Sequence, residues 1–336
     1  MTYSSAGLIQ AADFNGFVGP TANGGTAGAN LNDIWGTGAT DKGWGQTAVA
    51  NPSAASTVTA TQWASLVNNL ATAGTQTSTA LTARSAPTAG NTISILAALN
   101  ADLTSVTTNR GNAAASGTEY GTFSGTTSKT TGTGSGQSAW TITFTHTVTF
   151  PSADQARYFW NAGGIVRIKY GKSSTGTDAD ADWNTFSGLC GTINLTGRVA
   201  GAAQTIAGQS YTGTTRLSGT GGTQTTLTTT TGWYNLTGSA TTIFQLNDTV
   251  SPYSTNFIRT QATATSSTVL TLTTVWSDDG TGTAGATANI TGGTATSSPS
   301  TTISGTAPTT LVTYLPPSTA SLTNSWGTPS IAASVA

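Results

Sequence analysis

The chain has very few ionisable side chains. Charged residues make up 7% of its 336 residues, where about 25% is usual, and it has one histidine and one glutamate, Glu119. Acid–base and nucleophilic catalysis need such groups held close together. The scarcity therefore argues against an enzyme. The formal net charge of −1 also gives little long-range attraction for phosphates, so nucleic acid is not an expected partner.

Cysteine is scarce, and a secretion signal and long apolar runs are lacking. Cys190 is the only cysteine, so no intrachain disulfide can form, and we expect its thiol to pack as a small apolar group. The first residues, MTYSSAGLIQ, lack the basic start and continuous apolar core of a signal peptide. No segment reaches the roughly 20 apolar residues that span a bilayer. We expect a soluble protein made in a cytosol, with no membrane partner.

Threonine, glycine, alanine and serine dominate the composition, together with 9 Trp, 8 Tyr and 9 Phe. Disordered chains usually combine high net charge with few aromatic residues, and neither applies here. Threonine fits the half-exposed face of a pleated sheet, and the aromatic rings supply large apolar bodies for a core. The composition therefore predicts a folded, mainly β protein.

Helical periodicity is confined to the N-terminal third of the chain. Two segments place apolar side chains on one stripe at helical spacing. The first stripe contains Trp63, Leu66, Val67 and Leu70, and the second contains Ile95, Leu99, Leu103 and Val106. Gly74 follows the first stripe and is expected to end that helix. We predict that these helices pack together in a helical attachment domain over residues 1–113.

The remainder of the chain has strand signals. Residues 114–138 are rich in Gly, Thr and Ser and are predicted to form a linker or loop. Residues 139–336 begin with TITFTHTVTF, which alternates strictly between one core face and one threonine face. Seven further strand candidates are GGIVRIKY, LCGTINLTGRV, GWYNLT, TTIFQL, NFIRTQATA, TVLTLTTVW and TTLVTYL. Their spacing fits an antiparallel sandwich or barrel, and no amphipathic helix is evident between them; we predict an antiparallel β-sandwich in this part.

The acidic residues offer little support for a catalytic or metal site. Apart from Glu119, the clustered carboxylates are Asp178, Asp180, Asp182, Asp278 and Asp279. The segment TDADADWNTFSG begins like a calcium loop, but Trp183 stands where that loop needs glycine and Leu189 where it needs its closing glutamate. We interpret these carboxylates as belonging to exposed turns and predict no metal site.

The basic residues likewise favour structural roles. His146 lies within the strict strand alternation, so we interpret it as a core or rim histidine and not as a hydrolase base or zinc ligand. The segment YGKSS fails as a phosphate loop, because Val166 stands where the first glycine is required. Four cations lie near aromatic residues: Arg157, Arg167, Lys169 and Lys172. Such a group can bind single-stranded nucleic acid, but stacking on rings or capping a sheet edge is more common.

Two Trp- and Gly-centred segments carry a family resemblance. The first is IWGTGATDKGWGQTAV followed by TATQWASLVNNL, and the second is FPSADQARYFWNAGGIVRIKY; GWYNLT and VWSDDGTGT follow in order. Together they resemble structural, fibre-like proteins of the neck or tail of tailed bacteriophages, particularly cyanophages. The resemblance implies a virion component assembled in the host cytoplasm, present in several copies around the neck, tail or baseplate. Its partners would be other copies of itself and other virion proteins, and the resemblance brings no catalytic residue or cofactor.

Aromatic residues within and beside these segments are the candidate packing and attachment anchors: Trp35, Trp44, Trp63, Phe159 and Trp160. Glycines beside Trp35 and Trp44 permit tight backbone turns around the rings. In the second segment, residues 156–160 are expected to form a short aromatic turn before Gly163 and Gly164 lead into a strand.

Two other functions remain open. A carbohydrate-binding adhesin or receptor-binding module would have a host surface glycan as partner, and it would need aromatic rings outside the core. Trp233, Tyr234 and Trp276 are the candidates for such rings, although a core role is favoured for each. A depolymerase is disfavoured because histidine and glutamate are nearly absent.

Overall fold

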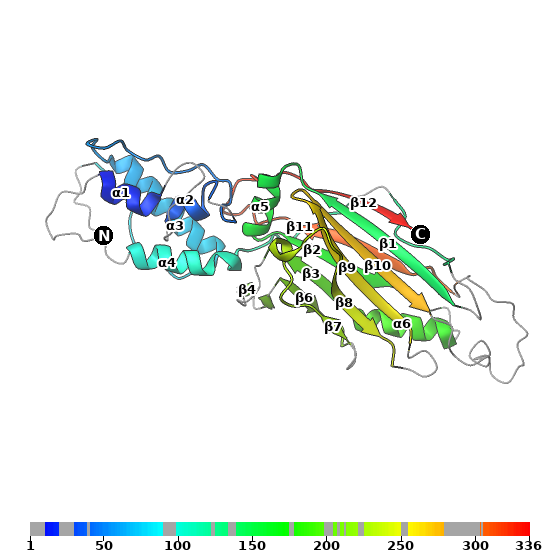
Figure 1. Ribbon diagram of the computed structural model, residues 1–336. Coiled ribbons are helices and arrows are strands. Elements are labelled where there is room, and N and C mark those ends of the chain that lie inside the picture. The colour runs from blue at the N-terminus through cyan, green and yellow to red at the C-terminus, as the bar shows by residue number, and fades with distance from the viewer. Residues whose placement is uncertain are drawn as a thin grey trace, which may run out of the picture.

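The protein is elongated, with helices at one end and β-sheets at the other (Figure 1). The computed structural model describes residues 11–19, 30–38, 41–89, 99–121, 125–133, 139–174, 178–197, 204–206, 209–211, 213–220, 225–249, 255–278, 303 and 305–336. The helical end contains α1 (Ala11–Val18), α2 (Leu31–Ile34), α3 (Ala60–Gln76), α4 (Leu99–Asn109) and the 3₁₀ turn η1 (Arg110–Asn112).

Helix α3 forms the centre of the helical end. It starts at a capping box, in which the Thr59 side chain accepts from the Gln62 N–H and the Gln62 side chain accepts from the Thr59 N–H. The predicted stripe is buried, and the Trp63 ring meets Phe14 of α1 edge-on at 4.9 Å. The prediction that Gly74 ends α3 is wrong. The helix continues to Gln76, and Ser78 adopts the left-handed conformation that closes it.

The second predicted stripe is confirmed from Leu99 onward. Leu99, Leu103 and Val106 of α4 are buried in the same core as α3, while Ile95 lies outside the described residues. One buried ion pair holds the connection between α3 and α4 in place. Asp102 of α4 pairs with Arg84 and accepts a hydrogen bond from the Thr82 N–H at 3.1 Å.

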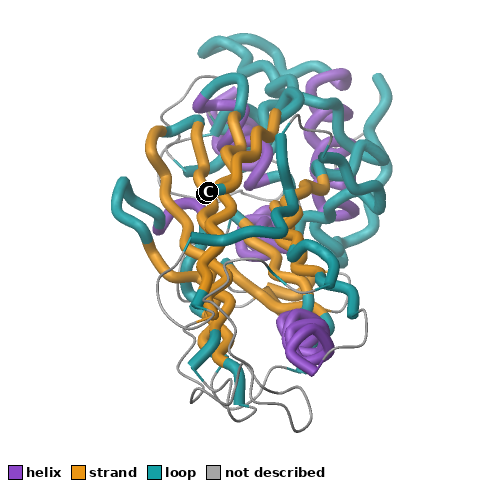
Figure 2. The backbone as a smooth tube through the Cα atoms, turned by 90° about the vertical axis from the view of Figure 1, so that its right-hand side faces the viewer, coloured by secondary structure: helices purple, strands orange, loops and turns teal. Residues whose placement is uncertain are grey.

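The C-terminal part is built from two main antiparallel sheets, as predicted. The larger sheet has the order β12 (Ser330–Val335), β1 (Trp140–Thr149), β10 (Val269–Asp278), β9 (Phe257–Ser266), β8 (Thr241–Asn247) and β7 (Thr226–Leu227). The smaller sheet has the order β11 (Thr309–Leu315), β2 (Ile165–Gly171), β3 (Thr192–Thr196) and β6 (Thr214–Leu217). A further pair joins β4 (Gln204–Ile206) to β5 (Gln209–Tyr211). Figure 2 shows these strands from the end of the molecule.

The two main sheets enclose a core and are joined across it by hydrogen bonds. The alternation in β1 is confirmed, because Ile142, Phe144, His146 and Val148 are fully buried. The Tyr170 hydroxyl of β2 lies 2.7 Å from the Thr260 hydroxyl of β9, and the Trp276 indole of β10 donates to Thr310 of β11 at 2.9 Å. These bonds satisfy polar atoms that the sandwich buries.

Three segments differ from the sequence-based expectation. The aromatic turn expected at residues 156–160 belongs to helix α5 (Ala153–Asn161), which starts at the N-cap Ser152. The exposed acidic turn is helix α6 (Asp178–Cys190), and GWYNLT contains the 3₁₀ turn η2 (Trp233–Asn235) in place of a strand. Two helices therefore do lie between strands, at β1–β2 and β2–β3. The strands β2 and β3 are still antiparallel neighbours.

The segment predicted as a linker or loop runs beside the sheets where it is described. Ala115, Tyr120 and Ser128 form isolated bridges with Pro317, Tyr314 and Thr309 at the β11 side of the smaller sheet. Thr133 bridges Thr141 of β1. Residues 122–124 and 134–138 of this segment lie outside the described residues.

Candidate functional site

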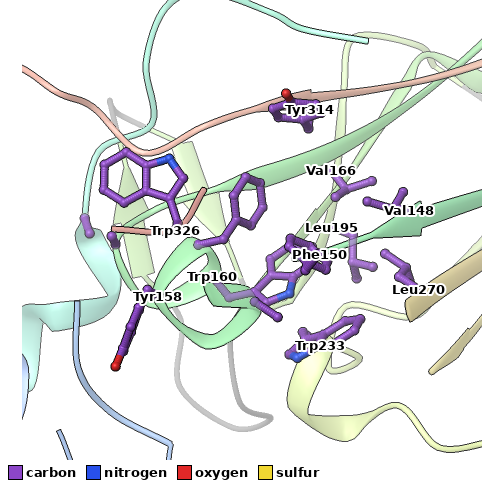
Figure 3. Packing of buried hydrophobic residues seen from close by; sticks show 14 of the residues in the cluster. Val148, Phe150, Tyr158, Trp160, Val166, Leu195, Trp233, Leu270, Tyr314 and Trp326 are labelled. Carbon is purple, nitrogen blue, oxygen red and sulfur yellow. The ribbon is translucent and has the colours of Figure 1, made fainter. Parts of the chain in front are cut away.

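Phe159 and Trp160 of α5 lie at the end of the sandwich nearest the helices. Their rings meet edge-on at 5.1 Å, and Trp160 stacks on Trp233 at 5.4 Å (Figure 3). Phe150, which follows β1, contacts Phe159 at 5.2 Å and Trp160 at 5.8 Å. Helix α5 thus closes one end of the core. The predicted anchor role of Phe159 and Trp160 corresponds to this internal packing.

Trp35 and Trp44 pack against each other at 6.4 Å between the helices and α5. The Trp44 indole donates to the Asn161 carbonyl at 2.9 Å, which ties the first resemblance segment to the second. Next to it, Gly45 has a φ of +66°, and a Cβ there would lie 2.4 Å from a ring carbon of Tyr158. The Tyr158 ring therefore packs against bare backbone, which only glycine permits at this position.

Asn161 joins three segments that lie far apart in the sequence. Its amide nitrogen donates to the Asp41 carbonyl at 2.7 Å, and its amide oxygen accepts from the Tyr234 hydroxyl at 3.0 Å. The backbone carbonyl of Asn161 also accepts a hydrogen bond from the Trp44 indole. Asn161, at the end of α5, therefore connects the loop at 41–44 with η2. Burial is the main reason that the pKa of the Tyr234 hydroxyl is raised.

Two glutamines make similar connections. The Gln46 amide donates to the Thr323 carbonyl at 2.9 Å and accepts from the Thr323 N–H at 2.9 Å. The Gln76 amide, at the end of α3, donates to the carbonyls of Ala114 and Ala162 at 2.9 and 3.1 Å. We call Trp44, Gln46, Gln76, Tyr158 and Asn161 the junction, because they join the helical end to the sandwich. Sequence reasoning missed the three amides, although Gln46 and Asn161 adjoin the tryptophans of the two segments.

The structure brings four of the five predicted anchors toward this junction. Trp35 and Trp44 approach it from the helical side, while Phe159 and Trp160 approach it from the sandwich. Trp63 lies apart from the junction, fully buried beside Phe14 and Phe17 in the helical core. All five rings are buried within the chain, so they act as internal packing anchors here.

The four clustered cations are divided among separate structural contacts. Arg167 and Lys169 both bind the carboxylate of Glu119, with Arg167 at 2.8 Å. Burial alone would raise the pKa of Glu119, but hydrogen bonds and charge from Lys169 and Arg167 outweigh it and lower the pKa. Arg157 pairs with Asp154 at 2.9 Å and lies over the Tyr158 ring, and Lys172 is buried near the Thr306 carbonyl.

The remaining reactive residue types are enclosed in the core. His146 is fully buried, and this burial lowers its pKa to about 4, so its ring is neutral at pH 7. Cys190 is buried, and burial raises the pKa of its thiol, as expected for a packing residue. Among the described residues, no three His, Cys, Asp or Glu side chains are grouped to hold a metal ion.

The acidic segment at 178–190 forms helix α6, which places its large apolar residues on one side, where they are buried. Trp183, Phe186 and Cys190 share one buried side of α6, and Trp183 contacts Trp140 and Trp276. Asp182 lies on the same helix and faces Asp248 and Asp278. Desolvation, a hydrogen bond with Asp248 and the charges of both neighbours raise the pKa of Asp182 to about 7. Asp279 and the side chains of Asp178 and Asp180 lie outside the part of the chain that the structure describes.

The three aromatic residues considered for sugar stacking do not form an open platform. Trp276 is fully buried between the sheets, Trp233 is buried against Trp160, and Tyr234 is directed at Asn161. The favoured core role is confirmed for Trp233 and Trp276, whereas Tyr234 is partly buried against the core.

No described helix is long and apolar enough to cross a membrane. Comparisons of the chain with protein-family models, curated proteins and solved structures find no match.

Proposed function

We propose that this chain is a structural component of a tailed-phage virion, associated with the neck, tail or baseplate, and that it assembles by protein–protein contacts. One observation carries the proposal. In the described part of the chain, aromatic and amide side chains join a helical end and a sandwich into one body, through Trp44, Gln46, Gln76 and Asn161. A body of this kind suits a component that holds its neighbours in fixed positions.

The placement of the reactive side chains supports the same proposal. His146 and Cys190 are enclosed in the core, and Glu119 is engaged by two cations. Catalysis would require such groups beside a substrate and in a usable protonation state. We therefore propose that the chain is not an enzyme, and that its partners are copies of itself and other virion proteins.

Quantitative mass spectrometry of purified particles tests this function. The number of copies of this chain is measured relative to the portal and tail-tube proteins of the same particles. We expect a fixed ratio that matches the symmetry of the neck, tail or baseplate and survives washing with salt. Absence of the chain from purified particles, or a ratio that varies between preparations, would reject the proposal. Specific binding on a glycan array would favour an adhesin instead.

A further inference from the structure

The larger sheet has one buried face and one outward face. Side chains along a strand alternate between the two faces. In β1 and β10, the residues that alternate with the buried ones therefore point away from the core. We call the outward set the threonine face. It comprises Thr141, Thr143, Thr145, Thr147 and Thr149 on β1; Val269, Thr271, Thr273, Val275 and Ser277 on β10; Phe257, Arg259, Gln261 and Thr263 on β9; Thr242, Gln245 and Asn247 on β8; and Ser330, Ala332 and Ser334 on β12.

Strand register arranges these residues in rows that cross the sheet. Thr145 lies opposite Ser334 on one side and Thr273 on the other, and Thr273 lies opposite Gln261. The next row aligns Ala332, Thr147, Thr271 and Thr263 in the same way. Neighbouring rows on one face are about 7 Å apart, and neighbouring strands are about 4.8 Å apart. Five of these eight residues are threonines, whose side chains carry both a methyl and a hydroxyl group.

The two helices of the C-terminal part pack on the other side of this sheet. Trp183 of α6 contacts Trp140 and Trp276, which belong to the buried face. Phe159 and Trp160 of α5 contact Phe150, which is also directed inward. In Figure 1 the strands β12, β1, β10, β9 and β8 lie side by side, with α5 near one end. Most residues of the threonine face are half-buried by their own neighbours, and Thr149 and the β12 members are exposed.

The charge of this surface limits what it can bind. Arg259 is the only charged member of the threonine face, and its guanidinium lies 5.1 Å from the centre of the Phe257 ring. A nucleic acid or an acidic polysaccharide would find few counter-charges there. The same face of a second copy would bring no charge repulsion and would leave little charge unpaired. Threonine hydroxyls on the two copies could donate and accept hydrogen bonds across the contact.

The dimensions and twist of the sheet also fit a second copy. β1, β10 and β9 are each 10 residues long, and β12 and β8 extend the surface on either side. With ordinary strand spacing and rise, these strands cover roughly 700 Å². A stable interface typically buries about 800 Å² on each partner. Two sheets with the same natural twist pack face to face at an angle of about 30°.

We propose that the threonine face is a self-association surface, on which a second copy of this chain packs with its own threonine face. The inference rests on the proposed assembly function and names the surface that serves it. The contact is isologous, so each substitution on the face is present twice in the interface.

A pair of charge substitutions tests this surface. Thr145→Lys places a cation in the centre of the face, whereas Thr185→Lys places the same cation on an exposed position of α6. Sedimentation velocity over a concentration series gives the dimer dissociation constant of each full-length protein. We expect Thr145→Lys to raise that constant at least about tenfold and Thr185→Lys to change it less than about twofold. Thermal unfolding verifies that both variants are folded.

Cross-linking gives a second readout that needs no charge on the sheet. Thr273→Cys and Thr185→Cys each add one accessible thiol, while Cys190 is buried. A short bismaleimide should join copies of Thr273→Cys at much higher yield than copies of Thr185→Cys. Equal yields, equal dissociation constants for the two lysine variants, or a wild-type protein that stays monomeric to about 1 mM would overturn the inference. The assembly function would fail separately, through absence of the chain from purified particles.

Discussion

Trp63 is one of the largest fully buried side chains of the chain and lies in the helical core. Its ring is fully buried and contacts Phe14 and Phe17. Trp63→Ala should lower the free energy of unfolding by about 3–5 kcal/mol, because it removes buried apolar area and leaves a cavity. Urea denaturation measures this loss. Tyr120→Ala is the control, since Tyr120 is 49% exposed and its removal should cost much less. A loss below about 1 kcal/mol at Trp63 would contradict its placement.

His146 should make stability depend on pH on the acidic side. Its pKa is about 4 in the folded protein and about 6.5 when unfolded. Between these values the unfolded chain binds more protons, so the free energy of unfolding should fall as pH decreases from about 6.5 to 4. The loss should reach up to about 3 kcal/mol. His146→Met, which does not titrate, should lose this component in urea denaturation measured across that range; an unchanged pH profile would contradict it.

Asp182 should act in the opposite direction, because its pKa is raised from 3.8 to about 7. The folded protein then binds more protons between these values, so stability should fall as pH rises from about 4 to 7. Asp182→Asn should remove this fall in denaturation experiments across the same range. Asp154→Asn is the matched control, because the Asp154 side chain is 63% exposed. Identical pH profiles for the two variants would argue against a protonated Asp182.

At the scale of elements, alanine substitutions at two glycines should change the stability of the protein in opposite directions. Gly45→Ala should destabilise the junction by about 1–3 kcal/mol, since its φ is positive and a Cβ would overlap the Tyr158 ring. Gly188→Ala in α6 should stabilise the protein by about 0.5–1 kcal/mol, since among the described residues no atom outside the local helix backbone lies within 4 Å of a Cβ there. Thermal unfolding of both variants checks the pair. Equal effects would show that Tyr158 does not pack on Gly45.

Long periodic elements were predictable from sequence, and short ones were not. α3 and β1 repeat their patterns over 17 and 10 residues, enough to separate helical from strand spacing. α5 spans 9 residues with an aromatic run, and its helical character depends on the Ser152 cap and on burial against Phe150. β12 was missed because SIAASV contains little apolar alternation, and its pairing with β1 decides its structure.

The contents of the junction were only partly predictable, for a related reason. Trp44 and Trp160 could be identified as buried anchors from their own size and neighbouring glycines. Gln46, Gln76 and Asn161 have distant partners in Thr323, Ala114 and Asp41, which lie 277, 38 and 120 positions away in the sequence. A buried amide is recognisable only when the carbonyls it satisfies are known, and those come from the fold.

At the scale of the whole molecule, the helical end and the sandwich should open together. The junction joins them by hydrogen bonds from both sides, and all described anchor rings belong to one continuous buried cluster. Separate bodies linked only by a flexible chain would lack these contacts. This continuity supports the proposed structural role.

Hydrogen exchange measured by mass spectrometry tests this continuity most directly. Opening free energies are obtained for the slowest amides of α3 and α4 and for those of β1 and β10 in the same protein. We expect the two sets to agree within about 1 kcal/mol, and to fall together when Asn161→Ala weakens the junction. Helices that open several kcal/mol more easily than the strands, and that do not respond to Asn161→Ala, would contradict a single body.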